Sequence, residues 1–224
     1  MHRRSRIHSG GMVTNIQGRL QNEINAVAQI HFYMSRLIEA GLKSTMITPE
    51  GRTIVGEYNT ELDRWRDTFA DKFFDTSTAI RLGTAIEICL RTYYMDRKSY
   101  STLIDLRNDA RCKKGIFQRV QNWQGANGVI SHYRDEIGYD LTTNSHLHAI
   151  QEAMMHRHLY AHNSGLLDDE YIDNIRQITG EDIRTHPSLA QSNHPAEDVY
   201  WFEPLDRLNL HIEEARRFFR QFPS

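Results

Sequence analysis

The chain has 224 residues, of which 39% are hydrophobic and 25% are charged, and this composition is typical of a soluble globular protein. A formal net charge of −2 argues against a protein that coats nucleic acid non-specifically, although a local basic patch could still bind RNA. Cys89 and Cys112 are too few for a disulfide framework, and no run of about 18 apolar residues is present to cross a membrane. We therefore expect a cytoplasmic protein without a membrane segment.

The N-terminal part of the chain divides into a lead and a long helix. Residues 1–12 are basic, contain glycine and lack the apolar run of a signal peptide, so we expect a flexible lead. Residues 13–224 show neither repeats nor a clear linker, which predicts a single domain. Apolar residues recur at helical spacing from Thr14, the expected N-cap, to Gly41, the expected stop, and predict an amphipathic helix.

Two more helices are predicted before residue 100. One spans about residues 59–74 and the other about residues 79–95, with a break at Thr76 or Ser77. In the second of these helices the acidic Glu87 stands within the apolar segment AIEICLRTYY. It is either an ordinary surface residue or a partner for a cation inside the bundle.

A strongly basic stretch follows these helices. Residues 97–119 contain seven basic side chains against two acidic ones, so this stretch either contacts RNA phosphates or forms a solvated loop and helix face. Residues 118–133 are expected to form short helices around a break. The candidate RNA-binding residues are Arg107, Arg111, Lys113 and Lys114.

The segment from Ser145 to Asp169 predicts a helix with a polar end. Ser145 is a suitable N-cap, and Gly165 is suited to the left-handed conformation that ends a helix. Arg157 lies on the same face of the predicted helix as the apolar residues. Burying a guanidinium is costly unless a polar or charged partner binds it. The predicted buried stripe consists of Leu147, Ile150, Met154 and Ala161.

Two histidines accompany Arg157 at the end of this helix. His158 and His162 are one turn apart and can face the same point. Arg157 and His162 are separated by about 140° around an ideal helix, so one copy cannot easily aim both at one atom. Either the helix end frays, or a second copy completes the site.

The sequence RHLYAH at 157–162 resembles the ribonuclease motif of the HEPN superfamily (higher eukaryotes and prokaryotes nucleotide-binding), in which four to six residues separate Arg from His. The following NSGLLD is similar to members that continue His-Asn-x-Gly and then apolar and acidic residues. Spacing alone is not specific, because Arg3 and His8 share it within the lead. The resemblance depends on the helix-end context and on the tail that follows.

The resemblance implies an all-α fold, a HEPN-like antiparallel helical bundle with additional N-terminal and C-terminal helices. It also implies a dimer whose motif helices meet at a two-fold axis, and an acidic residue that faces the motif helix, here Glu87. The activity implied is metal-independent endonucleolytic cleavage of single-stranded RNA by attack of the 2′-hydroxyl, in a toxin or antiviral-defence effector. Neither a metal nor a cofactor is expected.

The resemblance also implies a role for each candidate residue in RNA cleavage. Arg157 would stabilise the phosphate, and His162 would act as general base or acid, because histidine is suited to proton transfer near neutral pH. His158 would help by orienting or polarising the reacting groups. Glu87 and Asn163 would support the site.

Three other interpretations remain open. The first is a metal-binding bundle, since histidines crowd this helix and His158 and His162 have the spacing of paired ligands. The second is a non-catalytic module that works with a nucleotidyltransferase or antitoxin partner. The third is a helical bundle whose Arg and His residues are structural. The histidines in question are His146, His148, His156, His158 and His162.

The remainder of the chain predicts a helix over 168–178, a polar surface loop over 180–198 and an apolar strand or anchor over 199–202. Asp206 is expected to cap the last helix. The predicted apolar side of that helix consists of Leu208, Leu210, Ile212, Ala215, Phe218 and Phe219.

Overall fold

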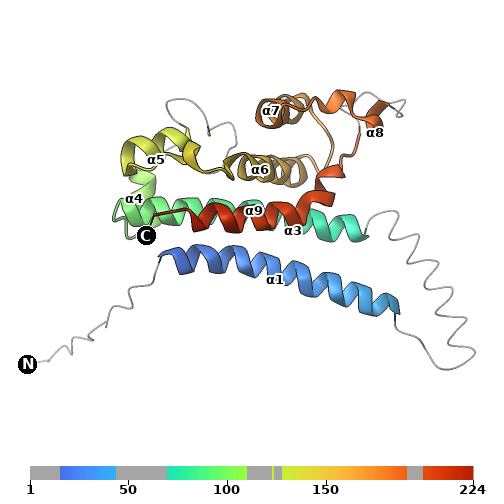
Figure 1. Cartoon of the computed structure of the whole chain (residues 1–224), viewed down its shortest axis with the longest axis horizontal. Helices are drawn as coiled ribbons and strands as arrows, with labels where there is room; N and C mark the ends of the chain where they lie inside the picture. Colours follow the sequence, from blue (N-terminus) through green and yellow to red (C-terminus); the bar gives the residue numbers. More distant parts are fainter. Residues whose placement is uncertain (1–15, 44–69, 110–122, 124–127, 191–198, 224) are drawn as a thin grey trace, which may run out of the picture.

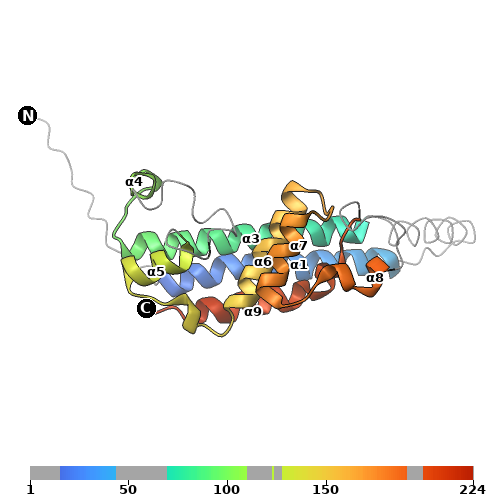
Figure 2. The ribbon, with the colours of Figure 1, turned by 90° about the horizontal axis from the view of Figure 1, so that it is seen from above.

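Three helices that are distant in the sequence lie side by side along the long axis of the molecule (Figures 1 and 2). They are α1 (Ile16–Lys43), α3 (Ala70–Arg97) and α9 (Leu208–Arg220). α1 runs in one direction and the other two return, and α1 packs against both. The structure, a computed structural model, describes residues 16–43, 70–109, 123, 128–190 and 199–223.

Two further helices lie across this layer (Figure 2). α6 (Leu147–His162) packs on α3 and α9, and α7 (Asp169–Thr179) packs on α6. α6 is therefore covered on most sides and carries buried residues all around its axis, which hides the helical pattern of its sequence. Leu147, Ile150 and Met154 are buried as predicted, whereas Ala161 is exposed in the last turn, so that part of the prediction is wrong.

Short helical elements complete the described chain, and the prediction of an all-α fold is confirmed. The part of the chain described here contains no strand, only an isolated antiparallel bridge between Leu166 and Tyr200. None of the helices found in it is long and apolar enough to span a membrane. The short elements are α4 (Leu103–Asn108), α5 (Val129–Ile137), η2 (Leu141–Thr143), η3 (Ile183–Thr185), α8 (Pro187–Ala190) and η5 (Glu203–Arg207).

The two predicted helix breaks in the long helices are wrong. α3 continues through Thr76 and Ser77, and the nearby Thr78 hydroxyl donates to the Phe74 carbonyl at 3.0 Å, so a polar side chain is satisfied inside the helix. α1 likewise passes through Gly41 to Lys43. The predicted Thr14 cap and the predicted helical residues 59–69 lie outside the described residues.

Two predicted N-caps are also displaced. α6 begins after His146 rather than Ser145, because the Asn144 side-chain carbonyl accepts the His146 N–H at 3.0 Å and forms a turn before the helix. α9 begins after Arg207, since Asp206 belongs to η5, which leads directly into α9.

The C-terminal predictions are corrected in part. Leu210 is exposed, and His211 lies buried on the packed side of α9 in addition to the predicted apolar residues. The predicted loop contains η3 and α8, with residues 191–198 outside the described chain. α7 occupies the position predicted for a helix. The expected helices around 118–133 appear as α5, which follows Gly128, while residues 118–122 and 124–127 are not described.

α3 and α6 are in close contact at Gly83. A Cβ atom at this position would lie 2.5 Å from the Cβ of Arg157 and 2.6 Å from its Cδ, well inside van der Waals contact. The first carbons of the Arg157 side chain therefore rest on the glycine backbone. The absence of a side chain at residue 83 sets the distance between the two helices.

We expect Gly83→Ala to lower the free energy of unfolding by about 2 kcal/mol, because the new methyl group forces α3 and α6 apart. Helix propensity alone would raise it by up to ~1 kcal/mol. Gly18→Ala in α1 is the matched control, since nothing lies within 4 Å of its added Cβ. Urea unfolding should show opposite signs for the two variants, and a stabilised Gly83→Ala would contradict the close contact.

Candidate active site

The guanidinium of Arg157 is held by a buried carboxylate across the interface of α3 and α6. Arg157 Nη1 lies 3.1 Å from Glu87 Oε2, and the Glu87 side chain is only 8% exposed. Arg91, one turn along α3, reaches the other oxygen of Glu87 at 3.4 Å. The predicted pairing of Glu87 with Arg157 is confirmed, and the surface interpretation of Glu87 is wrong.

This arrangement leaves a positive charge close to solvent. Two guanidinium groups share one carboxylate, so Arg157, Arg91 and Glu87 together carry a net charge of about +1. The Arg157 side chain remains 23% exposed, although its Nε is buried without a hydrogen-bond partner among the described residues. A cation that is both fixed and partly accessible is suited to contact with a phosphate oxygen.

His158 and His162 form a second feature on the last turn of α6. Their ring centroids are 4.9 Å apart, which agrees with the prediction that they face the same region. His162 is exposed and His158 is half-buried, so a ligand could reach both rings. Two neighbouring imidazoles can take part in proton transfer if a substrate is placed beside them.

The turn after α6 is held by hydrogen bonds to its neighbours. Asn163 is the C-cap, and its side-chain amide donates to Asp168, whose other oxygen accepts the Tyr171 N–H at 2.7 Å and caps α7. Ser164 and Gly165 both have positive φ angles, 53° and 91°, so the chain reverses within two residues. Asn163 therefore supports the turn. Gly165 has the predicted left-handed conformation but is not the C-cap, because Asn163 caps the helix and Ser164 is the first left-handed residue after it.

A distant segment is fastened to the same turn. The Leu167 N–H donates to the Val199 carbonyl at 3.0 Å, and the Trp201 N–H donates to the Gly165 carbonyl at 2.8 Å. The Tyr160 hydroxyl, on α6, also donates to the Trp201 carbonyl at 3.1 Å. The segment 199–202, predicted to be a strand or an anchor, thus fastens the end of α6.

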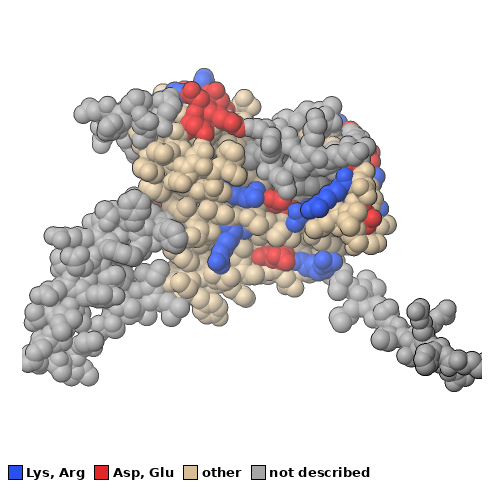
Figure 3. All heavy atoms as spheres, turned by 180° about the vertical axis from the view of Figure 1, so that it is seen from behind, with Lys and Arg blue, Asp and Glu red and all other residues tan. Residues whose placement is uncertain are grey.

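The predicted RNA-binding residues can be placed only in part. Arg107 is exposed on α4, whereas Arg111, Lys113 and Lys114 lie outside the described residues. Lys98, at the start of the basic stretch, is paired with Glu136 at 2.8 Å. Basic and acidic side chains are interspersed over the face seen in Figure 3. Phosphate binding by this stretch remains a prediction.

The histidines of α6 do not converge on one metal site. His146 pairs with Glu214 at 2.5 Å, and the ring of His148 lies 3.2 Å from the Ile178 carbonyl. His158 and His162 lie together, but within the described chain no third histidine, cysteine or carboxylate joins them. Among the described residues, these histidines therefore do not form one shared metal site, which the sequence had left open.

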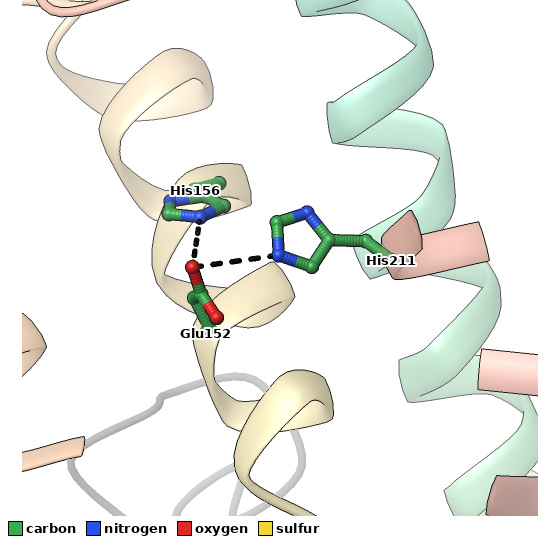
Figure 4. Close-up of side chains that lie close together, drawn as sticks. All are labelled: Glu152, His156 and His211. Atoms are coloured by element: carbon green, nitrogen blue, oxygen red, sulfur yellow. Dashed lines mark ion pairs between the residues drawn. The ribbon is translucent and has the colours of Figure 1, made fainter. Parts of the chain in front are cut away.

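A buried polar cluster that the sequence interpretation missed lies between α6 and α9 (Figure 4). Glu152 Oε1 is 3.4 Å from His156 Nε2 and 3.5 Å from His211 Nε2. Arg207 Nη1 approaches the same oxygen at 2.8 Å, and the Tyr171 hydroxyl lies 3.0 Å from His156 Nδ1. The sequence signals were the four-residue spacing of Glu152 and His156 and the apolar surroundings of His211.

The burial of this cluster shifts the pKa of two members in a consistent way. Burial lowers the pKa of His156 to about 4, and the nearby Glu152 carboxylate opposes this only partly. Burial would raise the pKa of Glu152, but its interactions with His156 and His211 outweigh burial and hold it well below its usual range. At neutral pH His156 is therefore neutral and Glu152 is ionised.

Comparison with known proteins gives no relative from which function could be transferred: no family model, no curated protein and no solved structure matches the chain.

We expect Glu87→Gln to lower the free energy of unfolding by about 2 kcal/mol, because Arg157 keeps a partly buried charge without its carboxylate. The double variant Glu87→Gln/Arg157→Gln should lose less than the sum of the two single variants, because the pair is removed together. Urea unfolding of the three variants measures this coupling.

The control is the exposed pair of Arg184 and Asp173, whose atoms are 3.4 Å apart. Asp173→Asn should change stability by less than about 0.5 kcal/mol. Additive effects of Glu87→Gln and Arg157→Gln would mean that the two side chains do not stabilise each other.

Proposed function

We propose that this chain is a metal-independent endoribonuclease that cleaves single-stranded RNA at the end of α6. One observation carries the proposal: Arg157, held by the buried Glu87 yet partly exposed, stands on the same helix end as the accessible pair His158 and His162. A fixed cation and two imidazoles at one helix end offer charge stabilisation and proton transfer, the two functions that RNA cleavage without metal requires.

The proposed reaction joins the RNA 2′-oxygen to the adjacent phosphorus and breaks the bond from phosphorus to the 5′-oxygen. The proton of the 2′-hydroxyl passes to a base, and the leaving 5′-oxygen receives a proton from an acid. His162 serves as base or acid, and Arg157 binds the phosphate oxygens. His158 orients or polarises the reacting groups. The products carry a 2′,3′-cyclic phosphate and a 5′-hydroxyl.

A homodimer is part of this proposal. Arg157 and His162 differ by about 140° around α6, so two copies that meet along this helix end could each contribute part of one cleft. In this arrangement the bundle is HEPN-like, the exposed Arg107 and its basic neighbours guide RNA, and the protein works in the cytoplasm as a toxin or antiviral-defence effector controlled by an antitoxin.

A second function is favoured by a specific contact. The ion pair with Glu87 leaves Arg157 Nη1 already engaged, which would suit a residue whose task is to join α3 to α6. The chain would then be a non-catalytic HEPN-like module that binds a nucleotidyltransferase or antitoxin partner through the same helix end.

The first experiment measures cleavage of single-stranded RNA by the purified chain in excess chelator. We expect His162→Ala to lower the rate by roughly 10²–10⁴-fold and Arg157→Gln by roughly 10²–10³-fold, through loss of proton transfer and of phosphate stabilisation. His148→Ala, an exposed histidine near the other end of α6, is the matched control and should cleave as wild type does. Wild type that cuts no RNA, or variants that cut equally well, would refute the nuclease and favour the non-catalytic module.

A mixing experiment tests whether the cleft is shared. Arg157→Gln and His162→Ala subunits are inactive alone, but a mixed dimer would contain one intact site if each cleft takes Arg157 from one copy and His162 from the other. Random equal mixing should restore about one quarter of the wild-type rate, since half of the dimers are mixed and each has one of two sites intact. Absence of restored activity in dimers proven to exchange would place both residues of a site on one copy.

A further inference from the structure

In the buried cluster between α6 and α9, the Nε2 atoms of His156 and His211 both lie near the same oxygen of Glu152 without making a hydrogen bond to it. His156 and His211 are only 4% and 2% exposed. The Nε2 atoms of both rings are buried and have no hydrogen-bond partner among the described residues, although each faces Glu152 Oε1 (Figure 4). Leaving two such atoms unsatisfied in a core is costly, so the arrangement calls for a ligand that both nitrogens can bind.

We propose that Glu152, His156 and His211 bind a divalent transition-metal ion of the zinc type. The distances from Glu152 Oε1 to the two Nε2 atoms are 3.4 and 3.5 Å, and all three atoms lie within 4.8 Å of one another. A tetrahedral ion with bonds of ~2.0–2.1 Å separates its ligands by about 3.3–3.4 Å, close to these values. Two imidazoles and one carboxylate form a donor set that Zn²⁺ commonly takes.

The surroundings of His156 prepare it for this role. The Tyr171 hydroxyl lies 3.0 Å from His156 Nδ1, on the side of the ring opposite Nε2. A hydrogen bond at Nδ1 orients the ring and, when Nδ1–H is the donor, leaves the Nε2 lone pair free for an ion.

Arg207 is a cation that would compete with a metal ion for the Glu152 carboxylate. Its Nη1 lies 2.8 Å from Glu152 Oε1, the same oxygen that faces the two histidines. Its side chain is 47% exposed, so the guanidinium can turn towards solvent and open the cluster to an entering ion. A bound divalent ion would repel the guanidinium and remove it from Glu152.

The site would serve the fold rather than the cleavage of RNA. His156 and Glu152 belong to α6 and His211 to α9, so an ion would join the transverse helix to one of the long helices. The three ligands are buried, whereas His158 and His162 are accessible from the surface. The proposal is therefore independent of the nuclease, which is assayed separately.

The test titrates chelator-stripped full-length protein with Zn²⁺ by calorimetry, and with Co²⁺ by absorption spectroscopy. We expect one ion per chain and a melting temperature raised by roughly 5 °C or more. His211→Gln and Glu152→Gln should each weaken binding by more than about 100-fold. The control is the double variant His158→Gln/His162→Gln, which removes the exposed pair and should bind the ion as wild type does.

Two milder variants keep all three ligands and protect the test against misfolding. Tyr171→Phe should weaken binding by roughly 10–100-fold through loss of the contact with His156. Arg207→Gln should tighten it by roughly tenfold, because a competing positive charge is removed. The proposal is overturned if stripped protein binds no Zn²⁺, if binding disappears only with His158 and His162, or if Tyr171→Phe and Arg207→Gln both leave the affinity unchanged.

Discussion

The close contact between α3 and α6 at Gly83 is the constraint on which the remaining geometry depends. Because residue 83 has no side chain, the stem of Arg157 rests on the backbone of α3, and the guanidinium extends along that helix to Glu87. A partly buried cation is tolerated there because the carboxylate compensates for its lost hydration. The position of the charge at the helix end is thus decided by one missing Cβ atom.

Neighbouring residues of α6 contact different helices of the layer beneath it. Arg157 reaches Glu87 on α3, while the preceding His156 belongs to the cluster with His211 on α9. Each side of the helix combines a buried carboxylate with a cation, so both interfaces have electrostatic requirements besides apolar packing. Such requirements fix the rotation of α6 about its own axis, since a turn of the helix would separate both carboxylates from their partners.

The sequence was informative where the chemistry is local. The stop of α6 near Gly165 follows from rules that act over a few residues, and the helix predicted over 168–178 is found as α7. The partnership of Glu87 with Arg157 was one of the two alternatives that the sequence left open, and a guanidinium among apolar residues favours it.

The features that could not be predicted from the sequence depend on packing between segments that are distant in the chain. Gly41 and the polar pair Thr76 and Ser77 are usual helix breakers, yet the long helices continue through them. The Glu152 cluster joins α6 to His211, which a reading of one helix at a time cannot bring together. α6 itself shows little periodicity because other helices surround it.

The enclosure of α6 has an evolutionary consequence. A residue that is packed on every side can change only together with its neighbours, so most of this helix has little freedom to vary. Ala161 and His162, in the last turn, face solvent, so packing does not restrict these two positions. Substitutions that change the chemistry of this helix without disturbing the core are therefore confined to its exposed positions, chiefly those of the last turn.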